Sequence, residues 1–319
     1  MKRKGWVWTI LFSLALAGFT GYVLADTFFI SRVYMVVSDS SSQSMFLSQE
    51  TSDVQESESN TSTSEVTEED TIDDNTVIST ENFYSDGNIS ISITEYREYD
   101  TSIYVADVML SSLEYLKTAF AQNAYGRNVT EKTSEIADRV DAILAINGDY
   151  YGAQESGYVI RNGVIYRDTS AGNEDLVIGT DGSFTIISES DVSASELLEN
   201  GAWQVLSFGP ALLEDGNISI TVDEEVGKSM ASNPRTAIGI VDSLHYVFVV
   251  SDGRTNESEG LTLYELAGFM EDLGCQIVYN LDGGGSSTMV FQGIVINNPT
   301  TSGNHIKERE VSDIVYIGY

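Results

Sequence analysis

Short apolar runs separated by turn-forming residues recur along the chain after residue 82 and predict many strands. Residues 89–94 alternate apolar and polar positions with period two, and residues 103–110 continue as a second strand after a hairpin connection at 97–100. The dipeptides Asn162-Gly163 and Asp181-Gly182 indicate two more hairpins. This region therefore reads as a β-sheet core.

In one segment the spacing of apolar residues changes from that of a strand to that of a helix and back again. Residues 244–250 and 276–281 are apolar strand-like runs, and between them residues 263–273 place apolar side chains on one helical face. Thr262 and Glu265 form the pattern of a capping box before that helix. Strand, helix, strand predicts parallel strands joined by a right-handed crossover. We expect a mixed α/β fold, in which a single domain has a β-sheet core, packed helices and this C-terminal βαβ unit.

The N-terminus carries an uncharged stretch at residues 6–24 that follows Lys2-Arg3-Lys4. Its length suits a helix that spans a bilayer with its basic flank in the cytoplasm. A secretory signal peptide cleaved after residues 23–25 is the alternative. Because apolar character resumes at residues 28–30, we favour an uncleaved anchor. In either case the rest of the chain lies outside the cytoplasm.

Residues 33–81 are rich in Ser, Thr, Glu and Asp, and no Lys or Arg occurs from 33 to 96. Such a composition cannot bury enough apolar surface to offset the entropy of ordering, so it predicts a disordered stalk. The expected organisation is a membrane anchor at 1–32, an acidic stalk at 33–81 and a folded catalytic domain at 82–319.

The formal net charge of −33 argues against nucleic acid as a partner. The single cysteine excludes an intrachain disulfide, and with only two histidines beside it a zinc site of the usual ligands is not expected. No cofactor is expected. A divalent cation among Asp149, Asp252 and Asp282 stays open, although no loop has calcium-ligand spacing.

Candidate chemistry lies where the predicted strands end. Asp252 and Asp282 are the first acidic residues after the two strands of the βαβ unit, so both should point into one crevice beyond the same sheet edge. If those strands are neighbours, about 5 Å apart, the two carboxylates share one site. Asp282 is followed by Gly283, Gly284 and Gly285, which permit close approach of a ligand to the backbone, and then by the hydroxyls of Ser286 and Ser287.

Two further clusters combine polar and aromatic residues. Asn147, Asp149 and Tyr150 follow a predicted strand, and either a tight hairpin or a sugar site fits them, since sugar sites pair rings with hydrogen-bonding side chains. Arg235 and Thr236 follow Pro234 at the start of another strand, where an arginine is a candidate anion clamp or a surface ion pair.

These motifs together resemble those of the phosphodiester glycosidase family, which includes the catalytic domain of the mammalian uncovering enzyme. The resemblance covers about residues 82–319 and rests on six elements in order: Asn147-Gly148-Asp149-Tyr150-Tyr151, Phe208-Gly209-Pro210, residues 234–239, Ser251-Asp252-Gly253-Arg254, residues 280–287 and Arg309. Tyr151 stands where many members have phenylalanine. The cysteine-rich extensions of the mammalian enzyme are absent, so its particular substrate is not implied.

The resemblance implies a hydrolase that cleaves a sugar-1-phosphodiester. With the membrane anchor expected from the N-terminus, it would act outside the cell on a cell-wall polymer or exopolysaccharide. Asp282 and Asp252 would be the catalytic carboxylates, and phosphate would be held by Arg235, Arg254 and the amides of 283–285. Sugar hydroxyls would be bound by Asn147, Asp149 and Asn280. Arg309 would close the site or pair with its acidic neighbours.

Two alternatives remain from the residues themselves. Ser286 or Ser287 as a hydrolase nucleophile lacks the Gly-x-Ser-x-Gly pattern and has few histidines to recruit. A non-catalytic wall-polysaccharide binding module would need the aromatic residues but not two carboxylates at strand ends.

Overall fold

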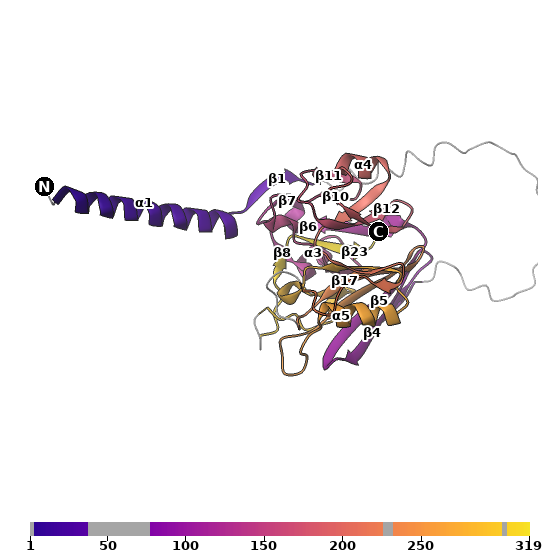
Figure 1. Ribbon diagram of the computed structural model, residues 1–319. Helices are drawn as coiled ribbons and strands as arrows, with labels where there is room; N and C mark the ends of the chain where they lie inside the picture. Colours follow the sequence, from indigo (N-terminus) through magenta and orange to yellow (C-terminus); the bar gives the residue numbers. More distant parts are fainter. Residues whose placement is uncertain (1–2, 38–76, 226–231, 302–304) are drawn as a thin grey trace, which may run out of the picture.

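Antiparallel strands make up most of the folded body in the computed structural model, which describes residues 3–37, 77–225, 232–301 and 305–319 (Figure 1). The largest sheet has nine strands in the order β16 (Asn217–Ile218), β15 (Ala211–Glu214), β19 (Ile277–Leu281), β17 (Thr236–Asp242), β18 (His245–Ser251), β5 (Thr101–Leu110), β4 (Ile89–Glu98), β3 (Phe83–Ser85) and β2 (Ile78–Thr80).

Two five-stranded sheets accompany it. One has the order β21 (Ile294–Val295), β20 (Met289–Phe291), β9 (Leu144–Asn147), β23 (Asp313–Ile317) and β6 (Leu116–Phe120). The other has the order β11 (Val164–Arg167), β10 (Val159–Arg161), β14 (Ala202–Leu206), β12 (Glu174–Gly179) and β13 (Phe184–Ser188). Two small ladders pair β1 (Arg32–Val36) with β7 (Ala124–Arg127) and β22 (Glu310–Val311) with β8 (Glu131–Lys132).

The main core lies where these three sheets meet. Phe248 from the nine-stranded sheet, Val315 from β23 and Trp203 from β14 belong to one buried apolar cluster. The indole of Trp203 donates a hydrogen bond to the backbone oxygen of Leu116 (2.8 Å), which satisfies the polar atom of this large buried ring. The core therefore fixes the relative positions of strands whose ends build the site.

The α-helices of the described residues are α1 (Arg3–Phe28), α3 (Thr133–Arg139), α4 (Ala194–Glu199) and α5 (Leu263–Asp272). The predicted capping box is present at α5, where Thr262 and Glu265 exchange side-chain and backbone hydrogen bonds. The apolar stripe of α5 packs against β17, β18 and β19 in a second buried cluster. The expected mixed α/β class fits only roughly, because strands dominate.

The two strands of the predicted βαβ unit are parallel, but they are not neighbours. β17 lies between β18 and β19 and pairs antiparallel with both, so those two strands run in the same direction without touching. Both still end at the same sheet edge, as expected, and β17 begins there with Thr236 opposite Val250 and Leu281. With strands about 4.8 Å apart, the ends of β18 and β19 lie about 10 Å from each other.

The predicted hairpins are confirmed. β4 pairs with β5 through a turn at Tyr99 and Asp100, and β10 pairs with β11 around Asn162-Gly163. β12 pairs with β13 around the turn that contains Gly182.

The N-terminal segments differ from a simple anchor and stalk. Within α1, residues Trp6–Thr27 are long and apolar enough to cross a membrane, a property that signal sequences share. β1 and β2 lie at the two ends of the segment expected to be a stalk, and each pairs with a strand of the folded body. Residues 38–76 lie outside the described residues, so the stalk prediction for them stays a prediction.

Candidate active site

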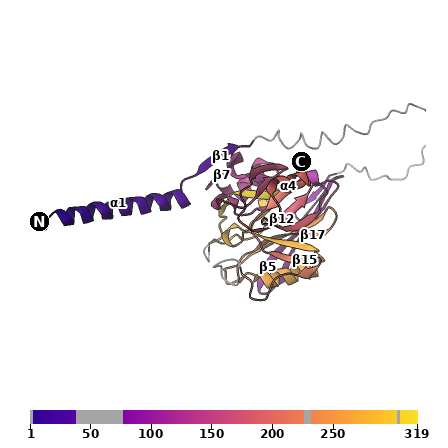
Figure 2. The ribbon, with the colours of Figure 1, turned by 45° about the horizontal axis from the view of Figure 1, so that its top comes forward.

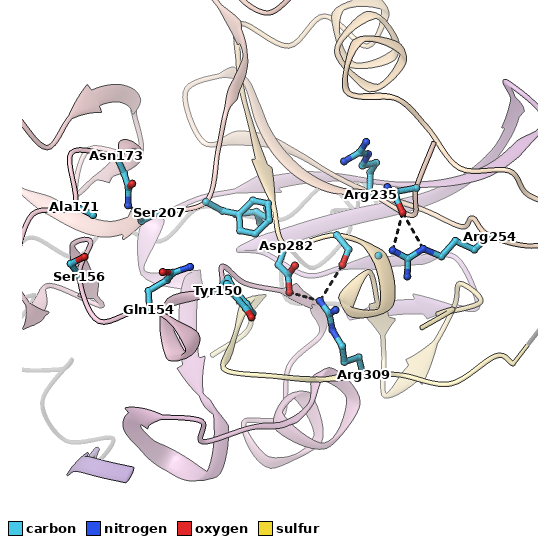
Figure 3. Close-up of a pocket in the computed structure, with 15 residues that line it drawn as sticks. Tyr150, Gln154, Ser156, Ala171, Asn173, Ser207, Arg235, Arg254, Asp282 and Arg309 are labelled. Atoms are coloured by element: carbon cyan, nitrogen blue, oxygen red, sulfur yellow. Dashed lines mark hydrogen bonds and ion pairs between the residues drawn. The ribbon is translucent and has the colours of Figure 1, made fainter. Parts of the chain in front are cut away.

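A pocket of about 510 Å³ opens at the edge of the large sheet where β17 begins and β19 ends. Figure 3 shows its polar and charged side chains. The lining residues are Tyr150, Gln154, Ser156, Ala171, Asn173, Ser207, Phe208, Asn233, Arg235, Arg254, Leu281, Asp282, Gly283, Gly284 and Arg309. Asp282 is the one carboxylate among them.

Asp282 follows β19 and is held on one side only. Its Oδ2 accepts hydrogen bonds from Ser286 Oγ (2.6 Å) and Arg309 Nη2 (2.7 Å). Its Oδ1 accepts no hydrogen bond from the residues that the structure describes. Burial raises the pKa of Asp282 above its ordinary value, although Arg309 and Ser286 oppose the shift. One carboxylate oxygen is thus fixed while the other is left for a ligand.

Ser286 is the link between Asp282 and Arg309. It lies in the short 3₁₀ turn Gly284–Ser286, and its Oγ accepts from Arg309 Nε (2.9 Å) while donating to Asp282. Since its proton goes to Asp282 and no histidine lines the pocket, the arrangement lacks the base that a serine nucleophile needs. The hydroxyl of Ser287 is buried and does not line the pocket.

Gly284 permits the close approach of an arginine to this turn. Its φ is +62°, and a Cβ there would lie 2.8 Å from Arg254 Nη2. Any larger residue would therefore strain the backbone and displace the guanidinium. Gly283 lines the pocket beside it, whereas Gly285 packs against Thr301 and does not.

Arg254 is positioned by neutral partners. Its Nε and Nη2 donate to Asn233 Oδ1 (3.0 and 2.9 Å), and its Nη1 donates to the backbone oxygen of Thr301 (2.8 Å). Burial lowers its pKa, and the neighbouring charge of Arg309 acts in the same direction. The charge of Arg254 is therefore not neutralised by a direct carboxylate contact among the described residues.

Arg235, which precedes β17, is more deeply buried. Its Nε donates to the backbone oxygen of Leu261 (2.8 Å) and its Nη2 to Glu225 (2.9 Å). Burial lowers its pKa and the pairing with Glu225 opposes this. The structure thus places Arg235, Arg254 and Arg309 along one side of Asp282, as Figure 3 shows.

Asp252 does not share this pocket. Its Oδ1 accepts from the backbone N–H of Asn298 (2.7 Å) and its Oδ2 from Asn298 Nδ2 (3.0 Å), and it does not line the cavity. Asn297 also donates to Oδ1 (3.3 Å). The insertion of β17 between β18 and β19 separates the two aspartates, and the expected shared site is replaced by a loop-holding role for Asp252.

Thr236 and Asn147 form a chain of hydrogen bonds that holds the backbone of Asp282. Asn147 Nδ2 donates to the backbone oxygen of Asp282 (2.6 Å), and its Oδ1 accepts from Thr236 Oγ1 (2.9 Å). Asn280 is also buried and donates to the backbone oxygen of Gly209 (2.7 Å). Both side chains therefore hold backbone next to the pocket, and the sugar-binding roles expected for Asn147 and Asn280 stay predictions.

Asp149 belongs to a buried ionic cluster. Its Oδ2 accepts from Arg161 Nη2 (2.7 Å) and from the backbone of Ser207 (2.9 Å), and Arg161 Nε donates to Asp313 (2.8 Å). Burial raises the pKa of Asp313 to about 7, with Arg161 opposing the shift. The side chain of Asp149 therefore ties Ser207 to the core, while its neighbour Tyr150 is exposed and lines the pocket.

The other end of the pocket is polar and uncharged, and no motif predicted it. Gln154, Ser156, Asn173 and Ser207 line it, opposite the arginines in Figure 3. These residues lie on loops without a periodic pattern, and only Phe208 stood in a recognised motif.

Buried Glu189 shapes this uncharged end. Its carboxylate accepts hydrogen bonds from the backbone of Tyr158 (2.5 Å), Ala171 (2.5 Å) and Asn173 (3.2 Å). Burial would raise the pKa of Glu189, but these N–H groups hold it below its ordinary value. Glu189 thus sets the backbone that carries Asn173.

A metal centre has no obvious ligand set here. Within residues 3–37, 77–225, 232–301 and 305–319, no group of three or more His, Cys, Asp or Glu side chains is placed to hold an ion. Asp149, Asp252 and Asp282 each have separate protein partners.

Comparison with known proteins identifies the family. A family model described as phosphodiester glycosidase matches residues 141–318, which is more than half of the chain. The chain belongs to the phosphodiester glycosidase family. Its members are hydrolases, and the matched region contains every residue that lines the pocket.

Relatives of this phosphodiester glycosidase include an uncharacterised Bacillus subtilis prophage protein, YomE, 30% identical over 61% of the chain. Human N-acetylglucosamine-1-phosphodiester alpha-N-acetylglucosaminidase is 30% identical over 57% of the chain. The matches span only 31% and 39% of those two proteins. The zebrafish catalytic domain of the latter enzyme, auto-inhibited by its pro-peptide, has the same fold, with a TM-score of 0.57, 23% identity and coverage of 72% of this chain and 83% of that one.

Proposed function

We propose that this phosphodiester glycosidase hydrolyses a sugar-1-phosphodiester, with Asp282 at the anomeric carbon and the arginines at the phosphate. The observation that carries the proposal is the setting of Asp282, a lone carboxylate beside three arginines in a chain of net charge −33. A cationic pocket on so acidic a protein favours an anionic ligand, and guanidinium groups match the geometry of phosphate oxygens.

The two ends of the pocket support one orientation of the substrate. The phosphodiester would lie toward Arg235 and Arg254, and the sugar hydroxyls would lie toward Gln154, Asn173 and Ser207. This order places the bond between sugar and phosphate beside Asp282. The substrate is thus a neutral sugar joined to an anionic phosphate.

The proposed reaction breaks the bond between the anomeric carbon and the phosphate oxygen. Oδ1 of Asp282 attacks the anomeric carbon and the phosphate monoester leaves with the bonding electrons. A phosphate monoester is a weak base, so its departure needs less help from a general acid than a sugar alkoxide does. Water then displaces Asp282 from the sugar, its proton goes to solvent, and configuration is retained.

The test is product analysis on a panel of glycosyl-1-phosphodiesters and matched sugar–sugar glycosides. Turnover should yield a free sugar and a phosphate monoester from the phosphodiesters, with retained configuration at first appearance. Hydrolysis of the plain glycosides at equal rate would contradict the phosphate role of the arginines. Cell-wall and exopolysaccharide phosphodiesters are the proposed natural class, since the chain is expected outside the cytoplasm.

Arg235→Lys should lower kcat/KM by about 10–100-fold, because it keeps the charge and loses a charge-assisted hydrogen bond worth about 1.5–3 kcal/mol. Lysine cannot reach Leu261, Glu225 and a phosphate together as the planar guanidinium can. The measurement is steady-state kinetics on the best phosphodiester. Arg97→Lys, at an exposed position on β4, is the matched control and should leave kcat/KM unchanged. Full activity in the Arg235 variant would remove this residue from the phosphate site.

We further propose that α1 is a single-pass anchor and that the folded domain is extracellular. Cys275 is buried, so a cysteine introduced at exposed Met109 is the one group that a thiol reagent should reach. Intact cells that produce Met109→Cys should therefore be labelled by a membrane-impermeant maleimide, and wild-type cells should not. Labelling of the variant only after lysis would place the domain inside the cell.

A further inference from the structure

The end of α1 is fastened to the folded body by one asparagine. Asn128 Nδ2 donates to the backbone oxygens of Asp26 (3.3 Å), Thr27 (3.1 Å) and Ile30 (3.2 Å). These carbonyls belong to the last turn of the helix and the residues just after it, where they lack helical partners. Ser31 Oγ in turn donates to the backbone oxygen of Asn128 (2.7 Å). The helix therefore ends on the domain.

β1 continues this attachment as a strand. Arg32, Val33, Met35 and Val36 pair with residues of β7, and the backbone N–H of Val37 donates to Asn123 (2.8 Å). The rings of Tyr34 and Tyr125 also touch, with centroids 5.8 Å apart. Only residues 29–31 separate α1 from β1.

The residues of this junction expose several large apolar side chains. Phe29 is 81% exposed, Tyr34 60% and Val36 76%, and Ile30, Val33 and Met35 are also exposed. This group, which we call the junction patch, follows α1 and is interrupted by Ser31 and by Arg32, which pairs with Asp26. Figures 1 and 2 show α1 leaving the body on the side of β1 and β7.

We propose that the lipid–water interface of the bilayer covers the junction patch, so that the domain sits directly on the membrane. Aromatic and apolar residues at the end of a membrane span are typical of the interfacial zone, where rings lie at the level of the headgroups. Continuity with α1 selects lipid as the occupant. The proposal rests on α1 remaining in the membrane and does not depend on the proposed reaction.

The segment expected to be a stalk, residues 33–81, begins with most of β1, which pairs with the folded body. This segment therefore does not separate α1 from the body. The substrates within reach are phosphodiesters near the membrane surface.

Lipid contact is tested with a fluorophore on a cysteine at Tyr34, in full-length chain reconstituted in phosphatidylcholine/phosphatidylglycerol vesicles. Buried Cys275 leaves the new thiol as the reactive one. Lipids spin-labelled at the headgroup should quench the Tyr34 label and leave a label at Met109 bright. Equal brightness at both sites would overturn the proposal, as would a chain that fails to stay with the vesicles.

The strand pairing is tested by Gly126→Ala. A Cβ at Gly126 would lie 2.2 Å from the backbone oxygen of Arg32 and 2.8 Å from Val129, so β1 must move off β7. A donor on Glu155→Cys, beside Arg127 of β7, should transfer energy to acceptor lipids in the wild-type background and lose at least about half of that transfer in Gly126→Ala.

Two controls complete the experiment. Gly268→Ala makes the same chemical change in α5, where a Cβ would meet nothing within 4 Å, and should keep the transfer. Activity on a soluble phosphodiester should be unchanged in Gly126→Ala, which shows an intact domain. Quenching at Tyr34 that depends on protein density and not on the lipid label would assign the patch to a second copy of the chain and overturn the proposal.

Discussion

Asp282→Asn is expected to reduce turnover of a sugar-1-phosphodiester by at least about 10²–10⁴-fold, the range that one positioned catalytic group typically contributes. Asparagine keeps the shape and can still accept from Ser286 and Arg309, but it has no negative charge for the anomeric carbon. The measurement is kcat from steady-state kinetics, with circular dichroism to confirm the fold. An Asp282→Asn enzyme that turns over normally would remove Asp282 from the reaction.

The same replacement at two other aspartates tests whether the effect at Asp282 comes from the reaction or from the fold. Asp242→Asn, at the exposed far end of β17, should change neither activity nor stability. Asp252→Asn should lower stability through its contacts with Asn297 and Asn298 and have a much smaller effect on kcat than Asp282→Asn. Equal losses of kcat at Asp252 and Asp282 would contradict this proposal and support a site in which both carboxylates act.

Arg161→Met is expected to destabilise the fold by about 3–5 kcal/mol, since it leaves buried carboxylates without their counter-charge. Arg161 is fully buried and pairs with Asp149 and Asp313, whose side chains are also inaccessible. A typical domain is stable by only about 5–15 kcal/mol, so this loss is large. Urea titration of the full chain in detergent measures it. Arg139→Met, at a partly exposed pair with Glu131, should cost much less.

The loss at Arg161 should also depend on pH in a defined direction. The pKa of Asp313 is raised to about 7 in the folded state, from an ordinary value near 4 when unfolded. The folded state therefore binds more protons, and the stability from this group is present at low pH and lost as the pH rises toward 7. Without Arg161 the pKa rises further, so the variant should suffer more at pH 8 than at pH 5. A pH-independent loss would show that Asp313 does not titrate in this range.

Local signals in the sequence were sufficient for elements whose partners lie close in the chain. The hairpin at Asn162-Gly163 and the capping box at Thr262 both formed, because their geometry depends on a few adjacent residues. The position of Asp282 at the pocket follows from similarly local features, because it directly follows a strand and precedes three glycines, and its catalytic role is a proposal.

Strand order was not accessible in the same way. β17 enters between β18 and β19 because it forms a tight hairpin with β18 through Ser243 and Leu244, while β5 pairs with the other edge of β18. β19 then pairs with the other edge of β17. Such a choice depends on contacts among four strands, which no local pattern encodes, and it determines why Asp252 lies away from Asp282.

Side-chain partners explain the remaining differences at the site. Asn147 and Asp149 had the composition of a sugar site, yet they meet Asp282 and Arg161 from distant parts of the chain. The sequence could not show that these polar groups are satisfied internally. Conversely, Gln154 and Asn173 line the pocket from loops whose sequences carry no chemical signature.

The pairing of β1 with β7 also determines what a single proteolytic cut does to this protein. A protease that cuts between β1 and β2 severs the covalent chain, yet both products still meet along the β1–β7 ladder and at Asn128. If α1 is the membrane anchor that we propose, the nicked protein stays on the membrane as a two-chain complex held by backbone hydrogen bonds. Release of the domain would also require β1 to dissociate from β7. Cleavage of the chain and release of the domain are therefore separate steps.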